Sequence, residues 1–166
     1  MKRASLALAL AGVFAVSTPA LAHSDTPNLL IVNVGDLLGG VVSLEYERAL
    51  RPWFGLTAGL SIYAFNGVFS PLSGPGFTGI IPELGARFHF IRDAPGGFWV
   101  GPYVTAGYLF SGGSRPFAWG LGAALGYNFI FGRHFTFQLG AGGGFTDLGD
   151  RLHWAPRLRI GLGAAF

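Results

Sequence analysis

The stretch from Phe117 to Gly132 most constrains what this chain can fold into, because it is long, apolar and uncharged yet lacks the period of a helix. Apolar side chains occupy every second position, and the positions between them hold mainly glycine and alanine. A strand places alternate side chains on opposite faces, whereas a helix would spread the glycines around its circumference. The alternation therefore predicts a strand with an apolar face and a face of small residues. The alternating apolar positions are Trp119, Leu121, Ala123, Leu125, Tyr127, Phe129 and Phe131.

The same two-residue period recurs along the chain and predicts eight strands. Most of them exceed the roughly 9–11 residues that a tilted strand needs to cross a bilayer. Short connections alternate with mostly longer ones, which is typical of a barrel with tight turns at one end and loops at the other. The expected strands are 28–35, 40–50, 53–65, 80–91, 98–110, 117–131, 134–146 and 154–166. The first of these lacks clean alternation.

Composition favours a membrane as the surroundings of these strands. The chain is 51% hydrophobic and 11% charged, whereas soluble domains are about 25% charged. In hydrocarbon an unpaired backbone group costs several kcal/mol, so the sheet must close on itself. We therefore expect an all-β fold, namely a closed antiparallel up-and-down transmembrane β-barrel of eight strands, with aromatic girdles at the strand ends. Pro82, Pro102 and Pro156 are expected at bulges or strand ends, because proline donates no ladder hydrogen bond.

The first residues have the pattern of an export signal. Lys2 and Arg3 precede an apolar run that is too short to span a membrane, and Ala20 and Ala22 then supply the small residues of a cleavage site. We expect residues 1–22 to be a signal peptide, exported through the Sec pathway, and residues 23–166 to be the barrel domain. Removing the signal lowers the formal charge from +3 to +1. The remaining chain has no basic stripe of the kind that nucleic-acid binding requires.

The phase of the strands places most of the ionisable residues within the strands on the inward face. An eight-stranded barrel is only wide enough for side chains to fill, so the first hypothesis is a lumen plug in which opposite charges neutralise one another. Inward glycines of the sixth and seventh strands would make room for the long arginines. The alternative is a narrow polar path or gated pore, since charged rings line selective channels. The lumen charge cluster comprises Glu45, Glu47, Glu83, Arg87, His89, Arg157 and Arg159.

The signal peptide, the alternation over the whole mature chain and the last strand, which ends in Phe166, resemble the small eight-stranded outer-membrane barrels of the OmpA, OmpX and OmpW kind. The resemblance implies a place in the outer membrane of a Gram-negative bacterium, contact with membrane lipid and lipopolysaccharide, and a monomer. It implies that Phe166 is the handle for the barrel assembly machinery. It also implies a structural or surface-interaction role or, alternatively, a narrow OmpW-like channel for small or hydrophobic solutes.

Some barrels of this kind modify lipid A with a histidine–serine pair, which makes a lipid A-modifying enzyme a further alternative. His89 is inward, with Ser43 and Ser61 on neighbouring strands. A second possible acid–base or metal group is His153 with Asp147 and Asp150. Solvated loop residues explain this second group better. We therefore expect no catalysis, no cofactor and no bound metal.

Overall fold

The structure is a computed structural model that describes residues 26–38, 40–63, 78–110, 117–132, 134–147 and 152–166. The predicted signal peptide, with Ala20 and Ala22, lies outside these residues. The predicted barrel domain contains all of the described residues.

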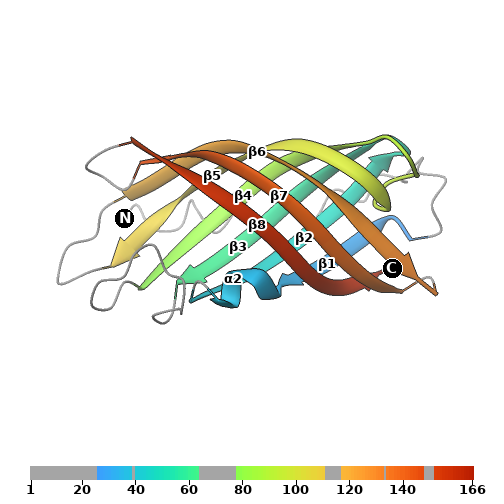
Figure 1. Ribbon diagram of the computed structural model, residues 1–166, viewed down its shortest axis with the longest axis horizontal. Helices are drawn as coiled ribbons and strands as arrows, with labels where there is room; N and C mark the ends of the chain where they lie inside the picture. The colour runs from blue at the N-terminus through green and yellow to red at the C-terminus, as the bar shows by residue number, and fades with distance from the viewer. Residues whose placement is uncertain (1–25, 39, 64–77, 111–116, 133, 148–151) are drawn as a thin grey trace, which may run out of the picture.

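Eight antiparallel strands close into one barrel within the described part of the chain, each paired with its neighbours in sequence and the last paired with the first. Figure 1 shows the strands inclined to the long axis of the barrel. The predicted all-β, up-and-down architecture is confirmed. The strands are β1 (Asn28–Asn33), β2 (Val41–Arg51), β3 (Phe54–Tyr63), β4 (Thr78–His89), β5 (Gly97–Phe110), β6 (Phe117–Phe131), β7 (Phe135–Asp147) and β8 (Leu152–Ala165).

The strand registers fix the stagger of the barrel. A path that follows paired residues once around the wall leaves β8 at His153 and returns to β8 at Gly163, ten residues farther along. Such a stagger corresponds to strands inclined by roughly 35–45° and to an interior that side chains can fill. The path runs through His153, Thr146, Gly120, Thr105, Glu83, Gly59, Glu45, Ile31 and Gly163.

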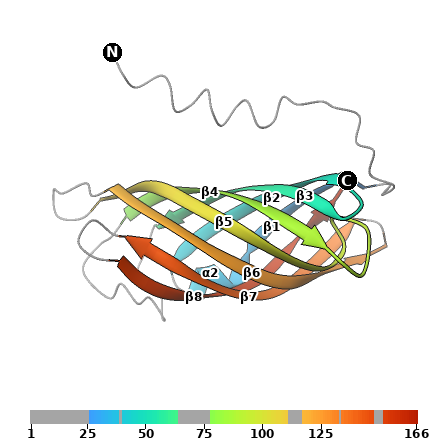
Figure 2. The ribbon, with the colours of Figure 1, turned by 90° about the horizontal axis from the view of Figure 1, so that it is seen from above.

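The two ends of the barrel differ. Asn28 and Phe166 exchange two backbone hydrogen bonds of 2.9 Å, so the first and last strands meet at one end, beside the three short turns at 52–53, 90–96 and 132–134. We call this the terminal end. The opposite end, where β3, β5 and β7 end and β4, β6 and β8 begin, is the loop end. Figure 2 shows the described C-terminus at the terminal end of the wall.

Burial alternates along the strands as the sequence predicts. On β6, Leu121 and Leu125 are exposed on the outer face, while Ala124 and Asn128 are buried on the inner face. Aromatic rings gather at the terminal end, where Trp53 stacks on Phe88 with ring centroids 6.3 Å apart. The outer wall is therefore a continuous apolar surface bordered by aromatic side chains, as a barrel in hydrocarbon requires.

The expected first strand, 28–35, is two residues too long. The strand ends at Asn33, and Val34–Leu38 form the short helix α2, which lies against β2 and β8 (Figure 1). Gly40, with a positive φ of 81°, donates its N–H to Leu37 O and ends the helix as a left-handed glycine does. Among the described residues, no helix is long and apolar enough to cross a membrane. Because β1 ends opposite Gly161, α2 rather than a strand lies beside the loop-end half of β8.

The prolines occupy neither bulges nor strand ends, contrary to the expectation from the sequence. Pro82, Pro102 and Pro156 lie within β4, β5 and β8 in unbroken register, and the only register shift in the described strands lies between Ala49 and Arg51. Paired residues are instead missing between β4 and β5 beside Pro82 and Pro102. A proline without an N–H interrupts the ladder locally, and the closed barrel maintains the register on either side.

The outer face yields a first prediction. Leu125 lies midway along β6 and is 50% exposed, and Leu152 begins β8 at the loop end and is 55% exposed. L125R should lower the free energy of unfolding in lipid vesicles by about 2–4 kcal/mol, because it places a charge in the middle of the hydrocarbon, whereas L152R should cost less than about 1 kcal/mol. Denaturant unfolding of the refolded protein measures both. Equal losses for the two variants would show that Leu125 does not lie near the middle of the bilayer.

Candidate functional site

The structure places all seven residues of the lumen charge cluster inside the barrel. Six of them are buried, and the side chain of Arg157 is 20% exposed. Their strands are not all neighbours, because the glutamates come from β2 and β4 whereas Arg157 and Arg159 come from β8, across the lumen. The alternation of each strand turns these side chains inward, and the narrow lumen then brings them together.

The half of the cluster nearer the terminal end begins at His89. His89 Nε2 lies 2.7 Å from Glu47 Oε1, and Arg87 Nη1 donates to Glu47 Oε2 over 2.7 Å. Arg87 Nη2 also donates to Glu45 Oε1 over 2.5 Å. One guanidinium therefore bridges two carboxylates that lie two residues apart on β2.

The other half continues from Glu45 toward the loop end. Arg159 Nη1 donates to Glu45 Oε2, and Arg159 Nη2 donates to Glu83 Oε1 over 2.6 Å. Arg157 Nη1 donates to Glu83 Oε2. The cluster is thus a single file in which basic and acidic side chains alternate. In order from the terminal end it runs His89, Glu47, Arg87, Glu45, Arg159, Glu83 and Arg157.

Two aromatic rings from β5 flank this file of charges. The guanidinium carbon of Arg87 lies 3.8 Å from the ring centroid of Trp99, and that of Arg157 lies 5.1 Å from the ring centroid of Tyr103. A cation over an aromatic face is attracted by the negative charge of that face, most strongly where water is excluded. The aromatic rings therefore provide further favourable contacts for the buried arginines.

The inward glycines of β6 and β7 make room for these rings. A Cβ on Gly122 would lie 2.6 Å from the Tyr103 hydroxyl, and one on Gly126 would lie 2.7 Å from Trp99 Cζ2. The expectation that these glycines make room for the arginines is therefore wrong. The rings of Trp99 and Tyr103 fill the space beside the glycines, and the arginines pack against those rings. Trp99 was missed among the lumen residues, although the phase of its strand, which turns Tyr103 inward, also turns Trp99 inward.

The imidazole of His89 lies between two acceptors. Its Nδ1 is 2.9 Å from the carbonyl oxygen of Gly96, and its Nε2 faces the carboxylate of Glu47. A carbonyl oxygen only accepts, so Nδ1 carries a hydrogen and donates it to Gly96 O. His89 therefore connects the turn between β4 and β5 to Glu47 of β2.

The terminal end of the lumen is sealed by the turn between β4 and β5. Ala94, Pro95 and Gly96 of this turn are buried. Asn128 Nδ2 donates to Pro95 O over 2.7 Å, and its Oδ1 accepts from Trp99 Nε1 over 3.0 Å. An apolar cluster from β1 and β8 lies beside the terminal-end half of the file, because Leu29 pairs with Glu47 and Ile31 pairs with Glu45. Its members are Leu29, Ile31 and Ala165, with Ile130 packed against them.

A second apolar cluster lies at the loop end of the file. Ile81, Leu109 and Ala118 are buried together there, and Tyr63 packs against them. They come from β4, β5, β6 and β3, so the cluster extends across half of the wall. One apolar cluster therefore packs beside the terminal-end half of the file, and the other packs at its loop end.

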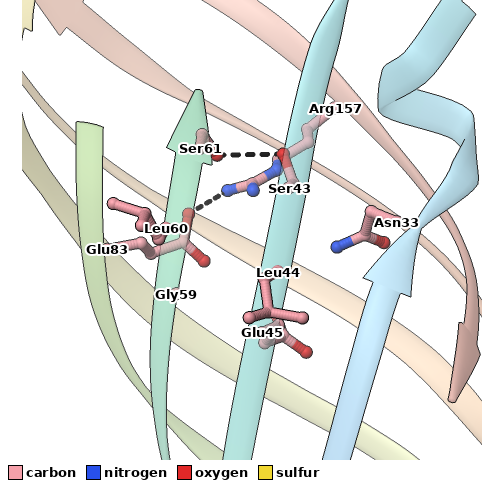
Figure 3. A pocket seen from close by; sticks show the side chains of 9 residues that line it. All are labelled: Asn33, Ser43, Leu44, Glu45, Gly59, Leu60, Ser61, Glu83 and Arg157. Atoms are coloured by element: carbon pink, nitrogen blue, oxygen red, sulfur yellow. Dashed lines mark hydrogen bonds and ion pairs between the residues drawn. The ribbon is translucent and has the colours of Figure 1, made fainter. Parts of the chain in front are cut away.

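A small cavity remains at the Arg157 end of the file. Asn33, Ser43, Ser61, Glu83 and Arg157 contribute polar groups to its lining, and Ser43 Oγ lies 3.0 Å from Ser61 Oγ (Figure 3). Its volume of about 10 Å³ corresponds to roughly one water molecule. Asn33 Oδ1 is buried without a hydrogen-bond partner in the described structure, so a water there would have a polar acceptor.

The histidine and the serines of the first alternative catalytic group are not brought together. His89 lies at the terminal end of the file, whereas Ser43 and Ser61 line the cavity at its other end. His153 pairs with Thr146 across β7 and β8, and Asp147 ends β7, while Asp150 lies outside the described residues. Within the part of the chain that the structure describes, no three potential ligands are grouped for a metal ion.

Phe166 is exposed at the seam between β1 and β8.

Comparison with known proteins places this fold among small outer-membrane barrels. The structure is similar to that of the Yersinia pestis outer membrane protein Ail, determined in a phospholipid bilayer nanodisc, with a TM-score of 0.51 and 16% sequence identity. The match covers 86% of this chain and 100% of the Ail chain. The predicted resemblance to small eight-stranded outer-membrane barrels is thereby confirmed for the fold. No protein-family profile matches the sequence, and no curated protein matches it.

Removal of a central charge should destabilise the barrel. Arg159 is buried and shared by Glu45 and Glu83, so R159M leaves two buried carboxylates without that partner and should lower the free energy of unfolding by about 3–5 kcal/mol. R157M, at the partly exposed end of the file and with Glu83 as its carboxylate, should cost clearly less. Denaturant unfolding in vesicles compares the two. A loss for R159M no larger than that for R157M would contradict the order of the file.

The hydrogen bond between His89 and Gly96 gives a separate prediction. H89F removes the donor to Gly96 O, and an unsatisfied buried carbonyl costs about 1–3 kcal/mol, so amide hydrogens of the turn 90–96 should exchange about tenfold faster. H134F is the matched control, because His134 Nδ1 contacts Ala165 O at a different turn. Hydrogen exchange followed by mass spectrometry resolves the two turns. Faster exchange at 90–96 in H134F as well would indicate general loosening instead.

Proposed function

We propose that this protein is an integral outer-membrane barrel with a sealed lumen, which acts as a structural or surface-interaction protein and neither transports nor catalyses. The observation that carries the proposal is the lumen itself. Seven charged or titratable side chains form one file inside it, and two apolar clusters pack beside the file and at its loop end. A lumen occupied in this way leaves the outer surface and the loop end as the parts that can meet partners.

The outer wall supports the membrane location. Its exposed side chains are apolar along the strands, aromatic rings gather near their ends, and the closed ladder leaves no free sheet edge at the meeting of β1 and β8. The fold likeness to Ail, an outer membrane protein, points the same way. Short turns face the periplasm in such barrels, so the terminal end, with Phe166 available to the assembly machinery, faces the periplasm.

A channel is less well supported than a plug. Charged rings that conduct need a water-filled path between them, but here each carboxylate is bonded to guanidinium groups from other strands. The cavity of about 10 Å³ beside Arg157 does not continue past Glu45 among the residues that line it. Passage of a solute would require the salt bridges to separate, and separated buried charges are costly.

A lipid A-modifying activity is also less well supported. A histidine that activates a serine needs a free ring nitrogen within hydrogen-bond distance of the hydroxyl. Both ring nitrogens of His89 face other partners, namely Gly96 O and Glu47 Oε1. Ser43 and Ser61 contact each other. This arrangement favours structural roles for all three residues.

The test is single-channel recording of the refolded protein in a planar bilayer. Folding is verified first by the heat-dependent mobility shift of the barrel on a gel. Folded protein should give no steady conductance steps, because the file of charges fills the lumen. Reproducible, ion-selective steps would contradict the sealed lumen and would indicate a pore lined by Glu45, Glu83 and Arg159.

A parallel measurement separates the enzyme alternative. Lipid A extracted from cells that express the protein should have the same mass distribution as lipid A from cells that lack it. A mass change that is lost in H89F but retained in H134F would establish catalysis and overturn the structural role.

A further inference from the structure

The charged side chains outside the lumen are distributed unevenly between the two ends of the barrel. Among the described residues, the arginines outside the lumen are Arg48, Arg51 and Arg92, and all three lie at the terminal end. Asp93 is the acidic side chain beside them. At the loop end the described acidic side chains are Asp36 and Asp147. The terminal end is thus the positive end of the described barrel.

Two of these arginines belong to neighbouring turns. Arg51 ends β2 and Arg92 lies in the turn between β4 and β5, and both are exposed. The turns are joined by backbone hydrogen bonds, with Ala94 N donating to Pro52 O over 2.7 Å and His89 N donating to Trp53 O over 2.9 Å. The two guanidinium groups are therefore carried by one connected part of the rim. Arg48 differs from them, because its Nη1 donates to Asn28 Oδ1 over 2.6 Å.

Large apolar side chains on the same two turns are exposed. Trp53 is 58% exposed, Phe90 66% and Ile91 67%. Trp53 also stacks on Phe88 of the lipid-facing wall, so its ring continues the apolar outer surface to the rim. Tryptophan at such a boundary typically sits among lipid headgroups, with its apolar body toward the acyl chains. The arginine–aromatic patch is the set Arg51, Trp53, Phe90, Ile91 and Arg92.

We propose that the arginine–aromatic patch binds the phosphate groups of anionic phospholipids in the leaflet that surrounds the terminal end. The apolar members enter the acyl region, and the two guanidinium groups contact headgroup phosphates at the depth of Trp53. A planar guanidinium donates two parallel hydrogen bonds to a phosphate. The two positive charges favour an anionic phospholipid over a zwitterionic one, in which a cationic group offsets the phosphate. The inference rests on the proposed membrane location and adds the chemistry of a lipid partner.

The position of Trp53 within the patch allows a local measurement. The protein is refolded into phosphatidylcholine vesicles that contain a minor fraction of phosphatidylglycerol, and the acyl chains of one lipid or the other are brominated to quench nearby tryptophan. W119F/W154F leaves Trp53 as the lipid-facing reporter, since Trp99 is buried in the lumen. W53F leaves Trp119 and Trp154 as reporters nearer the loop end.

In W119F/W154F, brominated phosphatidylglycerol should quench more strongly than brominated phosphatidylcholine at the same mole fraction. Each arginine near a membrane surface should strengthen the preference about fivefold at low salt. R51Q/R92Q in this background should abolish most of the preference, and high salt should weaken it. R115Q/R151Q, which removes the same charge from the connections 111–116 and 148–151, should leave it unchanged. W53F should show no preference for phosphatidylglycerol.

Two kinds of failure remain distinguishable. Equal quenching by the two lipids in protein that gives the heat-dependent gel shift would overturn the lipid site and leave the membrane barrel intact. A preference lost equally in R115Q/R151Q would also overturn it, because net charge rather than the patch would then attract the lipid. Failure to insert into any vesicle, with no gel shift, would instead contradict the proposed membrane location.

Discussion

The pairing of β1 with β8 is the constraint on which the rest of this structure depends. A sheet edge in hydrocarbon leaves backbone groups without partners at several kcal/mol each, so the ladder has to close. With eight strands and a stagger of ten residues, closure leaves an interior that side chains fill. Inward side chains from opposite walls then come within contact distance. Whatever charge the inward face carries has to be neutralised within that narrow space.

The file from His89 to Arg157 meets this requirement by alternating charge along the barrel axis. Each carboxylate is bonded to cationic partners, and Trp99 and Tyr103 provide aromatic faces that fill the space left by glycines. Buried ion pairs are weak evidence for stability, because their desolvation offsets much of their attraction. Their contribution to register is clearer. A one-residue shift in the register of β2 would point the side chains of Glu45 and Glu47 toward the lipid. Arg87 would then lose both of its carboxylate partners.

The wall around this file is regular except where the chain itself prevents pairing. Pro82 and Pro102 interrupt the ladder between β4 and β5 without shifting its register, because pairing on both sides holds the strands in place. At Asn33 the chain leaves the ladder, and α2 covers part of β8 instead of extending β1. The ends also differ in charge, with arginines and exposed aromatic residues around the terminal turns. These departures distinguish this barrel from a uniform cylinder and give its two ends different surroundings.

The sequence by itself determined the strand character, the inward and outward faces and the presence of charges in the lumen, because a period of two is a local property of each strand. It therefore placed Glu45, Glu83 and Arg159 on one face. Only the tertiary structure decided which of them meet, since β2, β4 and β8 are brought together by closure and stagger, which no single segment encodes. The same reason explains the missed helix after Asn33 and the part played by Trp99. Both depend on what lies across the barrel or beside β8, not on the residues adjacent in the chain.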